Sequence, residues 1–210
     1  MGLFFKQEIP QSNVLYSSGL ERTKLIVGLG NPGKEYDLTR HNAGFICVDG
    51  FVSDKSASWT EKKAFKALVA DLREGSTRII VIKPTTFMNL SGEAVQAVQA
   101  YFKITNVDTL VIHDELDINF GSLRIRQGGG SAGHNGIKSL IQHIGEDFMH
   151  VRLGIGPKTH EKMDSADFVL QQFSKDEQAE LKSMSQEVSS IITEFIYGTE
   201  LQAETRKYIL

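Results

Sequence analysis

The sequence predicts a single α/β domain with a mostly parallel, twisted sheet and helices on both faces. Short runs of leucine and β-branched residues recur along the chain, and segments with helical spacing of apolar residues lie between them. This alternation is typical of a sheet whose strands are connected by helices. The 210 residues suffice for one well-packed core, and 40% hydrophobic and 23% charged residues are ordinary for a globular protein.

Six segments are expected to form strands. Each is a short apolar run, or alternates apolar and polar residues over the length of a typical strand. In chain order they span residues 24–29, 65–72, 78–83, 109–113, 122–126 and 151–155. In the fifth segment Arg124 and Arg126 alternate with Leu123 and Ile125, so both arginines should project from one face of the sheet.

Helices are expected between and after these strands. One begins near His41, and a second has Ser91 as its N-cap. A third covers residues 137–144, where apolar side chains recur at helical spacing. The fourth follows a capping box formed by Ser174 and Glu177.

Charge and cysteine content narrow the class of protein. The formal net charge is −3, so no global positive field indicates nucleic-acid binding, although a local basic patch stays open. Cys47 is the only cysteine, which excludes a disulfide framework and a cysteine-rich metal site. No apolar run approaches the ~18 residues of a membrane span. We expect a cytoplasmic protein with no membrane partner, in which residues 1–22 are a loosely ordered extension and residues 23–210 the domain.

Polar side chains follow several of the predicted strands. In open α/β sheets, ligands bind outside the carboxyl ends of the strands. The segments that reach this edge contribute Asn31, Asn89 of "KPTTFMNLSG", His113 and Asp114 of "HDELD", and His134 and Asn135 of "GGGSAGHNG". The sequence therefore predicts an active-site-like cluster of amides, imidazoles and a carboxylate at this edge.

Two glycine motifs suggest other chemistry. Gly28, Gly30 and Gly33 match the G-x-G-x-x-G pattern of dinucleotide-binding proteins, but the helical pattern begins only near His41. We interpret these glycines as a tight turn that brings the main chain close to a substrate. The second motif surrounds Ser131 and matches the G-x-S-x-G of serine hydrolases.

The context of Ser131 argues against a nucleophile. The strand before it alternates with arginine, whereas a nucleophile elbow follows a buried central strand. Asp147 and His160 are the residues that could complete a triad, and neither clearly ends a strand. A glycine-rich loop whose amides bind an anion is the better interpretation, and a serine esterase using Ser131 is kept as an alternative.

Four segments together resemble the bacterial-type peptidyl-tRNA hydrolase family. They read "VGLGNPGKEYDLTRHNAGF", "KPTTFMNLSG", "HDELD" and "GGGSAGHNGIKS", in the order and approximate spacing of that family, and the resemblance covers about residues 24–173. It implies a single α/β domain that is usually monomeric and that hydrolyses the ester between a peptide and the 3′ end of tRNA, rescuing tRNA after aborted translation. Such a hydrolysis requires no metal, the sequence contains no H-E-x-x-H motif or His-Cys set to hold one, and we expect no cofactor.

The resemblance also implies roles by position. His41 in "TRHNAGF" corresponds to the catalytic base, and Asp114 corresponds to the carboxylate that orients it. Asn31 corresponds to the residue that helps to distinguish a peptidyl from an aminoacyl group, and it joins Asn89 in the catalytic set. The implied contacts to substrate and tRNA are Tyr36, Phe87, Asn89, Asn135, Arg126 and Arg152. The chain departs from the family in its long N-terminal extension and in its ending, "ETRKYIL".

The residue types suit ester hydrolysis by water. A histidine with a pKa near ~6.5 is mostly neutral in the cytosol and accepts a proton from water. A carboxylate on its other ring nitrogen fixes the tautomer, and asparagine amides donate to a carbonyl oxygen. From the residues alone, His113 and His134 compete with His41 for the role of base. A catalytically silent RNA-binding relative, like the hydrolase-like splicing factors of plant organelles, is the alternative from another class.

Overall fold

A computed structural model describes residues 22–157, 164–198 and 201–209. The expected extension over residues 1–22 lies outside these residues except for Arg22, which begins the first strand. His160, considered above as a partner of Ser131, also lies outside them. Within the described part of the chain, no helix is both long enough and apolar enough to cross a membrane.

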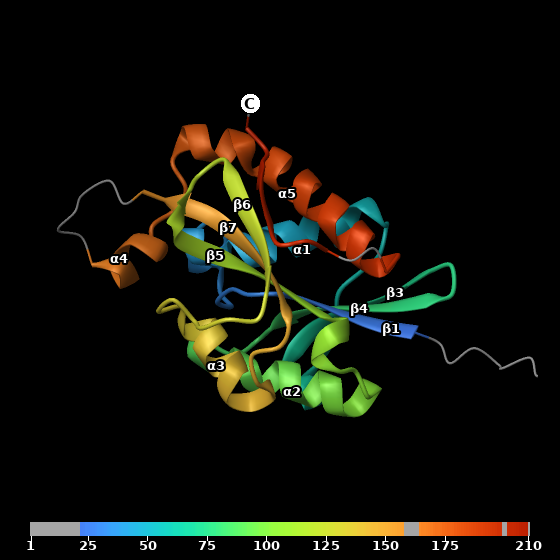
Figure 1. The fold of residues 1–210 in the computed structure, drawn as a ribbon. Coiled ribbons are helices and arrows are strands. Elements are labelled where there is room, and N and C mark those ends of the chain that lie inside the picture. Colours follow the sequence, from blue (N-terminus) through green and yellow to red (C-terminus); the bar gives the residue numbers. More distant parts are fainter. Residues whose placement is uncertain (1–21, 158–163, 199–200, 210) are drawn as a thin grey trace, which may run out of the picture.

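The domain is built on one eight-stranded sheet in the order β2-β3-β4-β1-β5-β7-β6-β8 (Figure 1). Its central four strands, β4-β1-β5-β7, run parallel, and the strands added at either edge pair antiparallel. The strands are β1 Arg22–Gly28, β2 Thr60–Lys62, β3 Ala67–Glu74, β4 Thr77–Pro84, β5 Thr109–Asn119, β6 Ser122–Gln127, β7 Met149–Gly156 and β8 Glu204–Lys207. The predicted parallel core is confirmed, and its edges make the sheet mixed.

Helices cover both faces of the sheet, as predicted (Figure 1). The helices are α1 Ala43–Asp54, α2 Ser91–Phe102, α3 Asn135–Ile144, α4 Ser165–Val169 and α5 Lys175–Ile196. One core cluster joins α1 and α5 to the first face of the sheet, and the second joins α2 and α3 to the other face. The capping box of Ser174 and Glu177 is confirmed. The N-cap prediction for Ser91 is wrong, because Ser91 is the first residue of α2 and its hydroxyl donates to the carbonyl of Met88.

Two strand boundaries differ from expectation. β3 begins at Ala67 because Lys63–Phe65 form a 3-10 turn and Lys66 has a left-handed φ of 51°. β5 continues through "HDELD" because β7 pairs with it up to Glu115 and, after an irregularity, again at Asn119. Asp114 therefore lies inside a strand, where its position is fixed by the sheet. The edge strands β2 and β8 were not predicted, since their polar sequences "TEK" and "ETRK" lack an apolar face.

Two glycines, Gly28 at the end of β1 and Gly44 in α1, allow a close approach between helix and sheet. A Cβ at Gly28 would lie 2.6 Å from the main-chain oxygen of Gly44, and a Cβ at Gly44 would lie 2.3 Å from that of Ile112. These contacts press the start of α1 against the ends of β1 and β5. At Gly28 the close approach is to α1, and the expected approach of the glycine turn to a substrate stays a prediction. Because α1 begins only at Ala43, the dinucleotide interpretation lacks its helix.

Candidate active site

A cleft of about 760 Å³ opens at the carboxyl ends of β1, β4 and β5. Residues from all four segments that carry the family resemblance line it. Those predicted from the sequence are Asn31, His41, Phe87, Met88, Asn89, Asp114, His134 and Asn135. The predicted cluster of polar side chains therefore forms at the expected edge of the sheet, except that His113 lines a second, smaller pocket beside the cleft. Tyr36, in the 3-10 turn Lys34–Tyr36, is not among the lining residues.

His41 lies in the turn that leads into α1 and faces the carboxylate of Asp114. Its Nδ1 is 2.9 Å and 3.1 Å from the two oxygens of Asp114. The carboxylate accepts, so Nδ1 of His41 donates, and Nε2 keeps its lone pair. Nε2 makes no hydrogen bond to any described residue, and His41 lines the cleft. His41 therefore offers a proton acceptor to the cleft.

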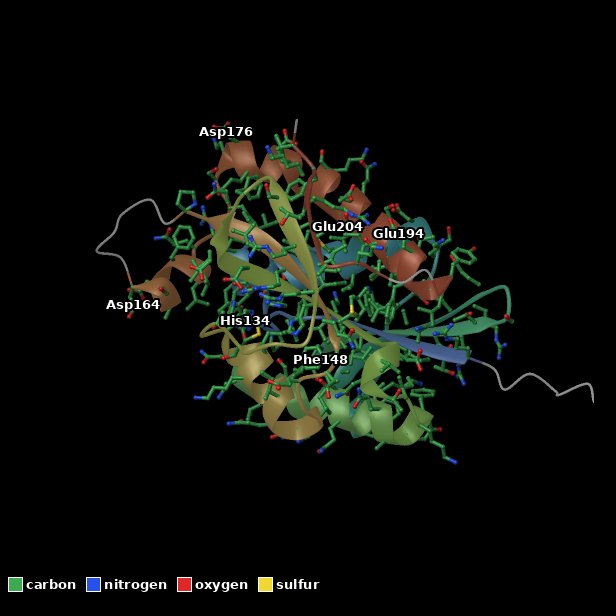
Figure 2. The ribbon with its side chains drawn as sticks, in the orientation of Figure 1. His134, Phe148, Asp164, Asp176, Glu194 and Glu204 are labelled. Atoms are coloured by element: carbon green, nitrogen blue, oxygen red, sulfur yellow. The ribbon has the colours of Figure 1, made fainter. Side chains whose placement is uncertain are left out.

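His134 is the N-cap of α3 and also contacts Asp114. Figure 2 shows it between the start of α3 and the sheet. Its Nδ1 accepts from the main-chain N–H groups of Gly136 and Ile137, at 3.1 Å and 3.2 Å. In the neutral ring the proton is then on Nε2, which lies 3.0 Å from Oδ1 of Asp114 and donates to it. Both ring nitrogens of His134 are used, so it has no lone pair left for a water.

His113 is the remaining competitor for the role of base, and its ring nitrogens are also both engaged. Its Nδ1 donates to the main-chain carbonyl of Asp114 at 2.9 Å, and its Nε2 lies 3.2 Å from Nδ1 of His150. Burial, followed by the charges of His134 and His150, holds the pKa of His113 well below its usual range. Of the three histidines at this edge, only His41 has a ring nitrogen that makes no hydrogen bond to any described residue.

The pair of His41 and Asp114 is electrostatically coupled. Burial alone would raise the pKa of Asp114, but the charges and hydrogen bonds of His41 and His134 hold that pKa far below its usual range. Burial disfavours the charged form of His41, and the charge and hydrogen bond of Asp114 outweigh this effect and raise the pKa of His41. Asp114 is 3% exposed, so its charge acts in a poorly solvated place.

The oxygen and nitrogen atoms of His41, Asp114 and His134 lie within 4.8 Å of one another, close enough to share a metal ion. The hydrogen bonds already use these atoms to link the three side chains to one another. A metal at Nε2 of His134 would need that nitrogen deprotonated, and the proton would then have to sit on Nδ1, which accepts two main-chain hydrogen bonds. The donor set therefore fits a hydrogen-bonded triad of side chains better than a metal centre.

Asn31 is held rigidly at the end of β1. Its Oδ1 accepts from the main-chain N–H of Met88 at 2.8 Å. The side chain of Asn42 binds the main chain of Asn31 on both sides, accepting from its N–H at 2.8 Å and donating to its carbonyl at 3.0 Å. The Nδ2 of Asn31 keeps no hydrogen bond to a described residue and is a donor for the cleft. Asn42 was missed by sequence reasoning, although it follows His41 directly.

One wall of the cleft comes from the segment that contains α4. Asp164, Ser165, Ala166, Val169 and Leu170 line the cleft, and none was predicted. Arg40 ties this segment to the turn of His41.

The guanidinium of Arg40 donates to the carbonyl of Gln172 at 2.7 Å, pairs with Glu177 and lies over the ring of Phe168. The sequence offered only one hint of this wall, the position of Arg40 beside His41, because the residues that Arg40 contacts are more than a hundred residues away.

A second pocket, of about 40 Å³, lies beside the cleft. We call it the anion pocket; its lining residues are His113, Glu115, Arg126, Gly128, Gly129, Gly130, Ser131, His150 and Arg152. The structure thus brings Arg126 and Arg152 together, as expected for a phosphate site. Arg152 pairs with Glu115, and no described carboxylate lies within ion-pair distance of Arg126.

Two other basic residues, Arg124 and Lys138, do not line the anion pocket. Arg124 projects from the same face as Arg126 and is paired with Arg152 across β6 and β7, but its Nε is 3.4 Å from Oγ1 of Thr205 on β8. Lys138 is exposed on α3 and lines neither pocket. Ser131 lies in the anion pocket and not in the cleft, and no described histidine hydrogen bonds to its hydroxyl. Within the part of the chain that the structure describes, the serine alternative therefore lacks a base.

The model of the peptidyl-tRNA hydrolase protein family matches residues 25–209 of this chain. The chain belongs to the peptidyl-tRNA hydrolase family. A member from Sulfurovum sp. (strain NBC37-1) is 44% identical over 166 residues, which are 79% of this chain and 85% of the relative. A member from Fusobacterium nucleatum is 41% identical over 186 residues, covering 88% of this chain and 95% of the relative.

Solved structures agree with this assignment. The crystal structure of the peptidyl-tRNA hydrolase from Acinetobacter baumannii matches with a TM-score of 0.79 and 32% identity, and the match covers 86% of this chain and 92% of that one. The predicted fold class is confirmed, and so is the predicted class of enzyme, a carboxylic ester hydrolase.

Proposed function

We propose that this chain hydrolyses the ester that joins a peptide to the 3′-terminal ribose of a tRNA, with a water molecule activated by His41. One observation carries the assignment of the base. His41 keeps a free Nε2 in the cleft while its Nδ1 donates to the buried carboxylate of Asp114. The ring nitrogens of His113 and His134 are all engaged in hydrogen bonds.

The reaction follows from this geometry. Nε2 of His41 accepts a proton from water as the water oxygen bonds to the ester carbonyl carbon. The tetrahedral intermediate then breaks the bond to the ribose oxygen, which takes a proton back from the imidazolium of His41. Asp114 stabilises that imidazolium without taking its proton. General base catalysis of this kind typically contributes about 10²–10⁴-fold to the rate.

Two asparagines are proposed to act on the carbonyl side. Asn31 presents Nδ2 toward the cleft from a fixed main chain, which suits a donor to the peptide or to the oxyanion. One well-placed oxyanion donor is worth roughly 2.7–4 kcal/mol. Asn89 is exposed in the cleft and is proposed to join it.

The remaining substrate contacts are also proposals. Phe87 is 57% exposed at the cleft and offers a flat apolar surface, and Asn135 offers an amide at the start of α3. Tyr36 is kept as a contact on the outer part of the substrate, since it lies outside the cleft lining. For the tRNA body, Arg126 and Arg152 are proposed to bind a phosphate in the anion pocket. We expect the enzyme to act as a monomer in the cytoplasm and to rescue tRNA after aborted translation.

A turnover assay with an N-acetylaminoacyl-tRNA tests the proposal. The wild-type chain should release free tRNA, and His41→Ala should lower kcat at least about a hundredfold, as expected for loss of a general base. Binding of tRNA should change little in this variant. His143→Ala is the matched control, because His143 lies on α3 outside both pockets. No release by the wild type would favour the silent RNA-binding relative, and a fully active His41→Ala would overturn the assignment of the base.

A further inference from the structure

The segment that contains β8 is fastened to the turn between β5 and β6. Strand β8 pairs antiparallel with β6, and Figure 1 shows this segment running along β6. Tyr208 follows β8 directly and binds Gly121 of the turn twice. Its main-chain N–H donates to the carbonyl of Gly121 at 3.0 Å, and its hydroxyl oxygen accepts from the N–H of Gly121 at 3.0 Å. One residue therefore satisfies both polar main-chain groups of Gly121.

These two hydrogen bonds hold a tight turn in one conformation. The turn consists only of Phe120 and Gly121, and Gly121 has a left-handed φ of 93°, which favours glycine. Gly121 is buried, and a buried main-chain N–H is costly to leave unpaired. Ile209 also lies over the turn, since a Cβ at Gly121 would be 3.3 Å from its Cδ1.

The turn places the side chain of Phe120 between two aromatic rings. Its ring centroid is 6.0 Å from that of Tyr208, with the ring planes nearly perpendicular, and 5.8 Å from that of Phe173. Aromatic pairs in such arrangements stabilise one another beyond the area that they bury. Tyr208 therefore acts on Phe173 through Phe120.

Phe173 is fixed on its other side to the turn that carries the proposed base. Its N–H donates to the carbonyl of Leu38 at 3.0 Å, and the main-chain N–H of Arg40 donates to the carbonyl of Gln171 at 3.0 Å. The guanidinium of Arg40 lies 4.5 Å from the ring centroid of Phe168 and 5.6 Å from that of Phe173. Phe173 thus connects the β5–β6 turn with the turn of His41.

The contact of Phe120 with Phe173 joins two walls of the cleft. Leu116, near the end of β5, lines the cleft from one segment, and Val169 and Leu170, at the end of α4, line it from the other. Leu116, Phe120 and Val169 pack against the same core cluster as Phe173. The placement of Phe120 against Phe173 therefore sets how far Leu116 lies from the wall of α4.

Protection of the sheet edge alone does not explain Tyr208. The edge is covered by β8, which ends at Lys207, whereas the hydrogen bonds of Tyr208 reach beyond the strand to the turn. Tyr208 also belongs to the ending "ETRKYIL", in which this chain departs from the pattern of its family.

We propose that Tyr208 is a positioning residue for substrate binding. It holds Phe120 against Phe173 and so keeps the two walls at the separation that the acyl group and the terminal ribose of the substrate require. Tyr208 does not itself line the cleft, so it acts through these residues. Asp114 is held by the pairing of β5 with β7, and His41 by Asp114, so the chemical step depends on Tyr208 less than binding does. The inference rests on the proposed function, because it concerns the same cleft.

Steady-state kinetics with an N-acetylaminoacyl-tRNA test the proposal. Tyr208→Ala should raise KM at least about threefold, as expected for a lost hydrogen bond and ring contact, and should change kcat much less. Tyr208→Phe keeps the ring and loses only the acceptor for Gly121, so its KM should lie between those of the wild type and Tyr208→Ala. The slope of log KM against log salt should stay as in the wild type, because no phosphate contact is lost.

Tyr197→Ala is the matched control. Tyr197 follows α5, is 69% exposed and lines neither the cleft nor the anion pocket, so its loss should leave KM unchanged. Amide hydrogen exchange then separates a local effect from a general loss of stability. In both variants of Tyr208 the N–H of Gly121 should exchange faster, while the N–H groups of α1 should stay as protected as in the wild type.

Three results would overturn the proposal: an unchanged KM in Tyr208→Ala, a loss confined to kcat, or equal losses of protection in the turn and in α1. Should Tyr208→Ala fail to fold, Tyr208→Phe decides, because an unchanged KM together with faster exchange at Gly121 would separate the turn from substrate binding. Turnover by the wild type is measured in parallel. Its absence refutes the proposed function, whereas turnover with an unchanged KM in the variants refutes the role of Tyr208 alone.

Discussion

The roles of His41, His113 and His134 differ because their partners differ, not because their intrinsic chemistry does. His113 and His134 each give one nitrogen to the main chain and the other to a side chain. His41 gives one nitrogen to Asp114 and leaves the other for a water. Asp114 receives donors from both His41 and His134, which keeps it charged although it is buried.

The charge of Asp114 should set the pH dependence of the enzyme. The base must be neutral, so kcat/KM falls as pH falls through the raised pKa of His41. In Asp114→Asn the charge that raises this pKa is lost while burial still lowers it. The acidic limb of kcat/KM, measured from pH 5 to 9, should therefore move to lower pH, and kcat should fall because the imidazolium is less stabilised.

Asp117→Asn is the control for this experiment, since Asp117 lies on the same strand but is exposed and outside the cleft. Its acidic limb should stay where it is in the wild type. An unchanged limb in Asp114→Asn would mean that another group governs the pH profile.

At the scale of elements, the site depends on how closely α1 approaches the sheet. Gly44 lies in the first turn of α1, and a Cβ there would lie 2.3 Å from the carbonyl of Ile112 on β5. His41 lies in the 3-10 turn Arg40–Asn42 that leads directly into α1, and Asp114 is two residues beyond Ile112 on β5. The separation of helix and strand therefore sets the distance between base and carboxylate.

Gly44→Ala distinguishes helix propensity from packing. Helix propensity predicts that alanine raises the free energy of unfolding by up to about 1 kcal/mol relative to glycine in a helix. Overpacking lowers the free energy of unfolding by about 1–3 kcal/mol, and here the added Cβ meets a main-chain atom, which cannot move away by a change of rotamer. We expect a net loss in the free energy of unfolding, measured by urea denaturation, together with a lower kcat.

Gly130→Ala is the control for stability, because an added Cβ there meets nothing within 4 Å. Its free energy of unfolding should match that of the wild type. If Gly44→Ala were as stable as the wild type, the close approach of α1 would not be the reason for glycine at this position.

At the scale of the whole molecule, a net charge of −3 has to coexist with binding of a polyanion. The structure concentrates positive charge locally, at Arg126 and Arg152 in the anion pocket. Elsewhere Arg22, Arg40 and Arg78 are paired with carboxylates. Arg206 likewise contacts Glu187, Glu194 and Glu204 and so fastens β8 to α5, where Figure 2 shows Glu194 and Glu204.

Salt dependence tests whether Arg126 contacts a phosphate. Arg126→Ala should raise KM for peptidyl-tRNA and reduce the slope of log KM against log salt by about one, as expected for one lost phosphate contact. A short ester without the tRNA body should be hydrolysed almost as before. Arg124→Ala is the matched control, because Arg124 lies on the same strand but contacts Thr205. Equal losses on both substrates would mean that Arg126 shapes the catalytic cleft.

Much of the fold could be predicted because it follows from local patterns. The parallel core strands carry continuous apolar runs, and the capping box of Ser174 and Glu177 is a local signal. The edge strands β2 and β8 carry no such pattern. β2 pairs with the nearby β3, whereas β8 pairs with β6, which is distant in the sequence. The wall formed by α4 is likewise joined to His41 only through the long-range contacts of Arg40.

The sequence alone determined the fold class, the family and the edge of the sheet where the polar residues gather, because strand and helix patterns and four motifs are properties of contiguous residues. Without the family resemblance, which pointed to His41, the residues left three histidines unranked, and the strand pattern placed Asp114 after a strand. Only the tertiary structure decided that His41 has the free nitrogen, that Asp114 lies within β5, and that Tyr208 binds the turn between β5 and β6. Hydrogen-bond direction is the reason: which nitrogen donates depends on atoms brought close by folding, and residue spacing carries no record of it.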